Sequence, residues 1–269
     1  MSSRRIPAVL SIAGSDSGGG AGIQADLKAF AACGVHGMTA ITAITAQNTV
    51  EVEAVELVSS EMVLNQIYAV GSDIGIDAIK IGMLGTPETV EGVVAALALT
   101  FHEAPVVVDP VMVAESGAVL LDDDTRERLI VRLLPMATVV TPNIPEARVL
   151  TGAGEGASQE DLARGVLELG REAELGPKAV VVTGGHSEEL VDLFFDGEQV
   201  VEIPGERHPG GAAHGSGCTH SSALAAYLAR GATPLEAARK ARTVASRAVG
   251  SGLREIGSGP GPVDVFGLR

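Results

Sequence analysis

Residues 214–219 place a histidine, two glycines and a thiol in one short loop. The loop reads His-Gly-Ser-Gly-Cys-Thr, and an Ala-rich run that predicts a helix follows it. Glycines just before a helix expose consecutive N–H groups, and the helix dipole adds positive potential at the same place. The loop is therefore predicted to stabilise a phosphoryl group while its charge is redistributed. This predicted anion hole consists of Gly215, Ser216, Gly217 and Cys218.

Cys218 lies in the same positive field, which favours the thiolate. The pKa of its thiol is expected to fall, and Cys218 is then a candidate base for the proton of an alcohol. Two other interpretations stay open. With the neighbouring His214 and His220, Cys218 could form a Cys/His hydrolase site, although no third group that would orient a histidine is evident. Cys218 could also be a small side chain that only packs a helix.

A second glycine-rich loop spans residues 13–22 and reads Ala-Gly-Ser-Asp-Ser-Gly-Gly-Gly-Ala-Gly before a predicted helix. So many glycines let the backbone approach a ligand closely and leave N–H groups pointing outward at the helix start. A flexible turn is the alternative, although a turn needs only one or two glycines. The spacing matches neither a dinucleotide fingerprint nor a P-loop, and no nucleophile elbow occurs in the chain.

Acidic and amide side chains follow two predicted strands. Asp109 ends a run of three valines, where a carboxylate can hold Mg²⁺, usually through water; the alternative is a cap for the next turn. Asn143 and Glu146 share one helical face and could jointly hold a hydrated metal and phosphates, or could form a capping box instead. Together with the two loops, these residues predict a phosphotransfer site that works by positioning and charge stabilisation.

A mostly parallel sheet would bring these residues together, because ligands bind beyond the carboxyl ends of parallel strands. Short Val/Ile runs alternate with longer Ala/Leu/Glu/Arg segments, as in repeated βα units. Neither a linker nor an internal repeat divides the chain, so residues 1–269 are predicted to form one domain. The predicted strands are 8–13, 38–43, 78–81, 106–109, 139–141, 180–183 and 190–195, with a hairpin partner at 199–203. The predicted helices are 22–33, 60–72, 87–99, 122–134, 144–150, 158–169, 218–230 and 234–252.

The composition excludes several classes of partner. A net charge of −15 and a pI near 4.8 disfavour nucleic acid, which requires a concentrated Lys/Arg surface. The two cysteines and the lack of a basic-then-apolar leader predict a reducing cytoplasm. The apolar runs are only as long as strands, so no membrane segment is expected.

The order of these motifs resembles that of the hydroxymethylpyrimidine/phosphomethylpyrimidine kinases of thiamine biosynthesis, within the ribokinase-like superfamily. The resemblance is carried by residues 13–28, 45–49, 80–84, 109–112, 141–146, 184–186 and 214–219, and it covers residues 8–252. It implies a three-layer α/β/α sandwich that transfers phosphate from ATP with Mg²⁺. The implied acceptors are 4-amino-5-hydroxymethyl-2-methylpyrimidine and then its monophosphate, at one site. Members of this family commonly form homodimers, so the resemblance also implies a homodimer.

The resemblance also implies roles for single residues. Gln47 would bind the amino edge of the pyrimidine, for which a side-chain amide offers both a donor and an acceptor. Cys218 would be the base. The other implied substrate contacts are Gly14, Ala21, Asp26, Met83 and Val111. The implied nucleotide and phosphate contacts are Asp109, Asn143, Thr183, Gly185 and Arg242, with Asp109, Asn143 and Glu146 around the metal.

Two departures from the family pattern bear on this function. Thr183 stands where the family usually has a Lys near the transferring phosphate, which is expected to weaken charge stabilisation unless Arg207 or Arg242 replaces it. Ala213 stands where a polar Thr commonly precedes the His-Gly pair. Two alternatives therefore stay open: a pyridoxal kinase of the same family, whose substrate also carries a hydroxymethyl group beside a ring nitrogen, and a weakly catalytic pyrimidine-binding sensor or enzyme subunit.

Overall fold

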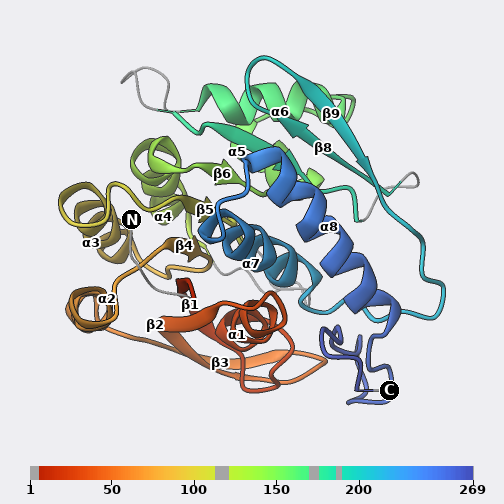
Figure 1. The fold of residues 1–269 in the computed structure, drawn as a ribbon, viewed down its shortest axis with the longest axis horizontal. Helices are drawn as coiled ribbons and strands as arrows, with labels where there is room; N and C mark the ends of the chain where they lie inside the picture. The colour runs from red at the N-terminus through yellow and green to blue at the C-terminus, as the bar shows by residue number, and fades with distance from the viewer. Residues whose placement is uncertain (1–5, 113–120, 170–175, 186–189, 269) are drawn as a thin grey trace.

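The computed structural model describes residues 6–112, 121–169, 176–185 and 190–268, and all of its strands belong to one nine-stranded sheet with helices on both faces (Figure 1). The order across the sheet is β3-β2-β1-β4-β5-β6-β7-β8-β9. The strands are β1 (Ala8–Ser15), β2 (His36–Gln47), β3 (Val52–Leu57), β4 (Ala78–Ile81), β5 (Val106–Val108), β6 (Val139–Val140), β7 (Ala179–Val182), β8 (Val191–Phe195) and β9 (Val200–Pro204).

The pairings from β2 through β1, β4, β5 and β6 to β7 are parallel, whereas β3, β8 and β9 pair with their neighbours in antiparallel fashion. The predicted hairpin of β8 and β9 is thus present at one edge. The helices are α1 (Gly22–Ala32), α2 (Ser60–Asp73), α3 (Pro87–Leu99), α4 (Asp123–Arg128), α5 (Ile144–Thr151), α6 (Gln159–Glu168), α7 (Ser216–Ala229) and α8 (Pro234–Gly250).

Two apolar cores explain why the central strands are rich in valine. Successive residues of a strand point to opposite faces, and here both faces are covered. Val107 and Val139 contribute to the core under α1, α7 and α8, whereas Val106, Val108 and Val140 contribute to the core under α2, α3, α5 and α6. Figure 1 shows the two groups of helices on opposite sides of the sheet. The three-layer sandwich with a mostly parallel sheet is confirmed.

Two predicted elements differ from the structure. The helix predicted at 122–134 is a short α4, then a π-helical turn (Leu129–Leu133) and a 3₁₀ turn (Leu134–Met136). Pro135 lacks an N–H, so a regular α-helix cannot continue through this point. Strand β3 was not predicted because it is almost wholly exposed and lacks the apolar density of the other strands.

Several elements begin or end at other residues than predicted, and two of these differences concern predicted site residues. Strand β2 runs to Gln47 rather than stopping at residue 43, so Gln47 stands at the carboxyl end of a strand. Helix α7 begins at Ser216, two residues earlier than predicted, so the Gly-Ser-Gly segment is its first turn. No helix in the described part of the chain is both long and apolar enough to cross a bilayer.

Candidate active site

A cavity of about 600 Å³ opens beyond the carboxyl ends of the parallel strands, where ligands of such sheets bind. The structure brings all but one of the predicted site residues to its wall, although they come from segments as far apart as β1 and α8. These lining residues are Gly14, Ala21, Gln47, Met83, Asp109, Val111, Asn143, Glu146, Thr183, Gly185, Gly215, Ser216, Gly217, Cys218 and Arg242.

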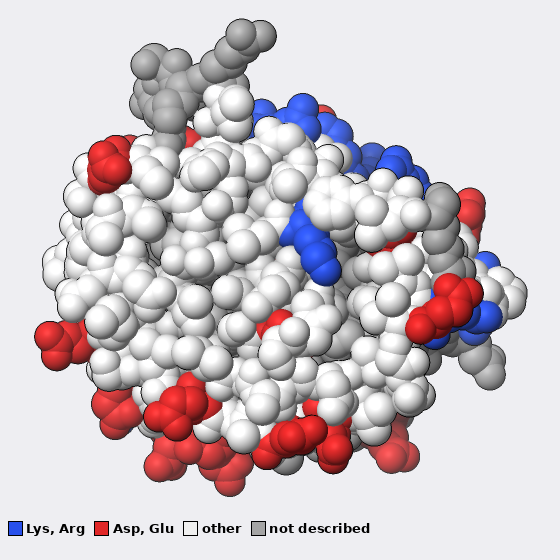
Figure 2. All heavy atoms as spheres, turned by 90° about the horizontal axis from the view of Figure 1, so that it is seen from below, with Lys and Arg blue, Asp and Glu red and all other residues white. Residues whose placement is uncertain are grey.

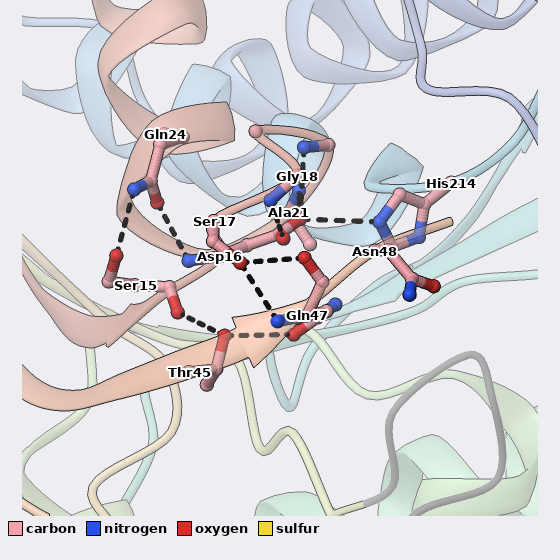
Figure 3. Close-up of polar contacts among 12 residues, drawn as sticks. Ser15, Asp16, Ser17, Gly18, Ala21, Gln24, Thr45, Gln47, Asn48 and His214 are labelled. Atoms are coloured by element: carbon pink, nitrogen blue, oxygen red, sulfur yellow. Dashed lines mark hydrogen bonds and ion pairs between the residues drawn. The ribbon is translucent and has the colours of Figure 1, made fainter. Parts of the chain in front are cut away.

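The carboxylate of Asp16 organises the first glycine-rich loop (Figure 3). Its Oδ1 accepts the N–H of Gly18 at 2.8 Å, and its Oδ2 accepts those of Gly20 at 2.9 Å and Ala21 at 2.7 Å. His214 Nε2 lies 3.4 Å from the same Oδ2. Burial by itself would raise the pKa of Asp16, but these bonds hold it below its ordinary value. Asp16, which the sequence analysis did not single out, therefore joins this loop to the loop before α7.

Gln47 is fixed by its backbone rather than by its side chain. Ser17 Oγ donates to the carbonyl of Gln47 at 2.6 Å and accepts from its N–H at 2.8 Å (Figure 3). The side-chain Oε1 takes a longer bond, 3.4 Å, from Thr45 Oγ1. The amide end lines the cavity from a firmly held strand end.

Lys80 is a wholly buried cation in the central strand β4. Its Nζ lies 3.0 and 3.1 Å from the two carboxylate oxygens of Asp26 and 3.9 Å from Asp109 Oδ2. Burial would lower its pKa, but these acids raise the pKa above the ordinary lysine value. Asp26 also accepts hydrogen bonds from Ser11 Oγ at 2.6 Å and Ser222 Oγ at 2.7 Å.

These contacts correct the expected position of Asp26. The side chain has no exposed surface and does not line the cavity, because its four bonds hold it between β1, β4 and α7. Asp26 instead holds Lys80, which does line the cavity. A lysine inside an apolar strand was the sequence signal for this missed site residue.

Two acids face each other across the ends of β5 and β6. Asp109 accepts a bond from Ser221 Oγ at 2.8 Å, and burial raises its pKa although Lys80 opposes the rise. Burial and the charge of Asp109 raise the pKa of Glu146 to about 8. Asn143 and Glu146 also form the capping box of α5, so that interpretation is confirmed. Both residues nevertheless line the cavity, so capping does not exclude a ligand role.

The loop before α7 depends on a glycine in a left-handed conformation. Gly215 has a left-handed backbone (φ +83°), and a Cβ there would lie 1.8 Å from the carbonyl oxygen of Gly20, so only glycine fits. The first turn of α7 lines the cavity, although the N–H of Ser216 donates to Ala213 O at 2.9 Å.

Cys218 differs from its prediction in one property. Burial, supported by the charges of Asp26 and Asp109, raises the pKa of the thiol to about 12, although Lys80 and the N–H of Gly22 lower it. The expected fall in pKa is therefore wrong. The helix dipole is visible in the sequence, whereas the burial of the thiol and the nearby charges of Asp26 and Asp109 are not.

The far end of the cavity carries Thr183, Gly185 and Arg242. Thr183 N–H donates to Pro142 O at 2.8 Å, and a Cβ at Gly185 would meet no described heavy atom within 4 Å. Arg242 lies 3.3 Å from Asp192 Oδ1 through its Nη1. Arg207 lines the same cavity. His186, which belongs to one of the family-like motifs, lies outside the described residues.

The Gly/Pro-rich C-terminal segment is tied to the turn after β2 and to the loop before α7. Thr49 Oγ1, in the turn after β2, accepts the N–H groups of Ser258 and Gly259, each at 3.2 Å. His214 N–H donates to Gly261 O at 3.3 Å, and Val263 N–H donates to His214 O at 3.0 Å. Residues 253–264 therefore link the Gln47 end of the cavity to the anion hole.

Comparison with known proteins places this site in a family. The family model described as phosphomethylpyrimidine kinase matches residues 16–264. The chain belongs to the phosphomethylpyrimidine kinase family. The hydroxymethylpyrimidine/phosphomethylpyrimidine kinase of Rhizobium meliloti (strain 1021) is 49% identical over 260 residues, 96% of each chain. The phosphomethylpyrimidine kinase of Clostridium difficile 630 superposes with a TM-score of 0.76 at 42% identity, over 88% of this chain and 96% of that one.

The structure of this phosphomethylpyrimidine kinase family member is also similar to a pyridoxal kinase. That enzyme of Bacillus subtilis, solved as an ADP complex, gives a TM-score of 0.86 at 35% identity, over 98% of this chain and 99% of that one. The predicted family and the ribokinase-like fold are confirmed, and the chain is a phosphotransferase.

Removal of the Asp26 carboxylate tests the buried ion pair. The Asp26→Ala variant leaves Lys80 buried without its main partner, and we expect the free energy of unfolding to fall by about 3–5 kcal/mol. Urea denaturation followed by circular dichroism measures it. The control is Asp123→Ala, which breaks an exposed pair with Arg126 and should change the stability little. Equal losses in the two variants would contradict this assignment.

Proposed function

We propose that this kinase phosphorylates 4-amino-5-hydroxymethyl-2-methylpyrimidine and then its monophosphate, with MgATP as the donor. The observation that carries the proposal is the meeting of Gln47, Met83 and Cys218 in one cavity with an anion hole. The names of the relatives support the same acceptors. An amide for the amino edge, an apolar contact for the ring and a loop for the transferred phosphate are the groups that these substrates require.

The ring of the substrate is proposed to lie between Gln47 and Met83. The backbone of Met83 is held by a 2.6 Å bond from Thr42 Oγ1 to its carbonyl. A Cβ at Gly14 would come within 2.8 Å of the Met83 methyl group, so glycine leaves room for the thioether there. Ala21 and Val111 add small and apolar surface to the same part of the wall.

The phosphates are proposed to bind between the acid pair and Arg242. Asp109, Asn143 and Glu146 suit a hydrated Mg²⁺, because burial raises the pKa of both acids and the charge of Asp109 raises that of Glu146 further, so a cation beside them would be favourable. No cluster of three or more metal-ligating side chains occurs among the described residues, so water and phosphate oxygens would complete the coordination. Mg²⁺, when bound, neutralises phosphate charge. Thr183 and Gly185 leave the loop after β7 open to the nucleotide.

Cys218 is proposed to take the proton of the alcohol as its oxygen attacks the phosphate. With a pKa of about 12, the thiol is protonated in the free enzyme at neutral pH, so only a small thiolate fraction can act as base. Positioning and the anion hole must then supply much of the rate enhancement.

The pH dependence of the reaction tests this role. We expect kcat/KM for the pyrimidine alcohol to rise between about pH 7 and 10 without a plateau, because the thiol titrates above that range. Cys218→Ala should retain the fold, its kcat should fall by about 10²–10⁴-fold, and its kcat/KM should not change with pH over this range. The matched control is Cys33→Ala, since Cys33 is buried in the core under α1 and α7. Full turnover in Cys218→Ala would remove the base assignment.

Parallel assays on two alcohols rank the substrates. A second candidate, pyridoxal phosphorylation, is favoured by the higher TM-score to the Bacillus subtilis pyridoxal kinase. We expect a larger kcat/KM for the pyrimidine, and formation of both its monophosphate and its pyrophosphate with MgATP. A larger value for pyridoxal would reverse the order. Tight pyrimidine binding in calorimetry without turnover would support the sensor alternative.

A homodimer is proposed as the assembly. Ile44, Val55 and Leu57 expose 56%, 44% and 46% of their surface on strands β2 and β3, and a second copy would cover them. Sedimentation velocity should give twice the 27.3 kDa chain mass, and Ile44→Glu should give the single mass. The control is Leu99→Glu at the end of α3. Figure 2 shows acidic side chains along the lower rim of the face seen from below, and Lys and Arg side chains along its upper right rim. The absence of a nucleic-acid partner and the cytoplasmic location stay predictions.

A further inference from the structure

Asp192 is a wholly buried acid in the wall of the cavity, outside the residues proposed to bind the substrate, the nucleotide or the metal. It lies on β8, away from the acid pair and the anion hole. Its Oδ1 accepts the N–H of Gly184 at 2.9 Å and lies 3.3 Å from Arg242 Nη1. One carboxylate oxygen thus joins the loop after β7 to helix α8. A buried charge reduces stability unless it is paired, so this position calls for a physical explanation.

Arg242 lies in a socket that fixes its guanidinium. Besides Asp192, its Nη2 donates to the carbonyl of Leu190. Leu190 is the one non-glycine residue with a positive φ, +50°, in the described part of the chain, and strained backbones of this kind gather at functional sites. A Cβ at Gly205 would lie 1.7 Å from Nη2, so the guanidinium packs directly on a glycine.

The socket leaves part of the guanidinium available for an anion. Arginine carries five N–H donors, and the contacts with Asp192 and Leu190 engage only its two Nη atoms. Its Nε is buried and has no hydrogen-bond partner among the described residues, so only the remaining N–H groups of the Nη atoms can reach an anion. Arg242 lines the cavity with a side chain that is 13% exposed, so an entering phosphate can reach it.

His220, on α7, faces the second oxygen of Asp192. Its Nε2 lies 3.6 Å from Asp192 Oδ2, slightly longer than a hydrogen bond. Neither ring nitrogen of His220 nor Oδ2 of Asp192 has a hydrogen-bond partner among the residues described. Burial, together with the charge of Arg242, lowers the pKa of His220, so the ring is neutral at neutral pH. Bonds of this length in ligand-free sites commonly shorten when the substrate binds.

We propose that Asp192 is a positioning residue for phosphoryl transfer, which fixes the Arg242 guanidinium relative to Gly184 and to the helix of the anion hole. His220 completes the unit from α7, the helix whose first turn forms that hole. The inference rests on the proposed contact of Arg242 with phosphate. Asp192 acts through Arg242 and does not itself touch the reacting atoms. Three segments around the phosphates, the loop after β7, helix α7 and helix α8, thereby share one anchor.

Two variants test the position of the guanidinium while leaving the arginine in place. Asp192→Asn keeps an acceptor for Gly184 but removes the charge that holds Arg242, and Gly205→Ala displaces the guanidinium by its new methyl group. In each, kcat should fall about tenfold or more, while the affinity for ADP in calorimetry changes less than about threefold because the positive charge stays in the cavity. The controls are Asp196→Asn, in the turn after β8, and Gly210→Ala, whose Cβ would come no closer than 4.0 Å to a neighbour.

A double-mutant cycle separates positioning from a general effect on folding. In an Arg242→Gln background, Asp192→Asn should lower kcat by less than about threefold, because the residue through which it acts is already lost. A further full tenfold loss in that background would overturn the proposal, as would a kcat within about threefold of wild type in Asp192→Asn.

The ³¹P NMR spectrum of bound ADP gives a readout that does not depend on the acceptor. The terminal phosphate resonance should move in Asp192→Asn and in Gly205→Ala, and stay in place in both controls. Movement would support the proposal even if the pyrimidine were not turned over, which would contradict the proposed function alone. An unmoved resonance in both variants, with pyrimidine turnover intact in the wild type, would contradict the positioning role alone.

Discussion

The buried charge of Lys80 is the constraint on which the rest of the site depends. An ammonium group in the central strand of a sheet has no water around it, so the fold must surround it with acids. Asp26 supplies the closest carboxylate, and hydroxyls of Ser11 and Ser222 hold that carboxylate in turn. Because Ser222 belongs to α7, the charge of Lys80 also fixes the helix whose first turn is the anion hole.

The charge of Lys80 also affects the acid pair of Asp109 and Glu146. Asp109 lies 3.9 Å from Lys80 and accepts a bond from Ser221, the neighbour of Ser222 on α7. One helix therefore sets the distance between the anion hole and the acids that would hold Mg²⁺. Burial is the main reason that the Cys218 thiol keeps its proton, and the charges of Asp26 and Asp109 add to it. A buried position near two acids is thus a poor place for a free thiolate.

Patterns among neighbouring residues predicted most of the fold. They could not predict the contacts between segments that are distant in the sequence. The alternating Val-rich runs predicted the parallel sheet, and the glycine spacing at 214–219 predicted a tight loop at the start of a helix, because both depend on neighbouring residues. The pKa of Cys218 was predicted with the wrong sign, since the burial of the thiol depends on the fold and Asp26 and Asp109 are more than 100 positions away in the chain. Asp26 was placed near the substrate because the family resemblance implies a contact there. Only the fold shows that its side chain turns the other way, towards Lys80.

The bonds from residues 253–264 to Thr49 and His214 have a consequence for synthesis on the ribosome. Every strand and helix of the sandwich precedes this segment in the chain, so the sheet can form before the segment emerges. The turn after Gln47 and the loop of His214 receive their last hydrogen bonds only when it does. A nascent chain would bury its core first and would order the Gln47 end of the cavity and the loop before α7 last.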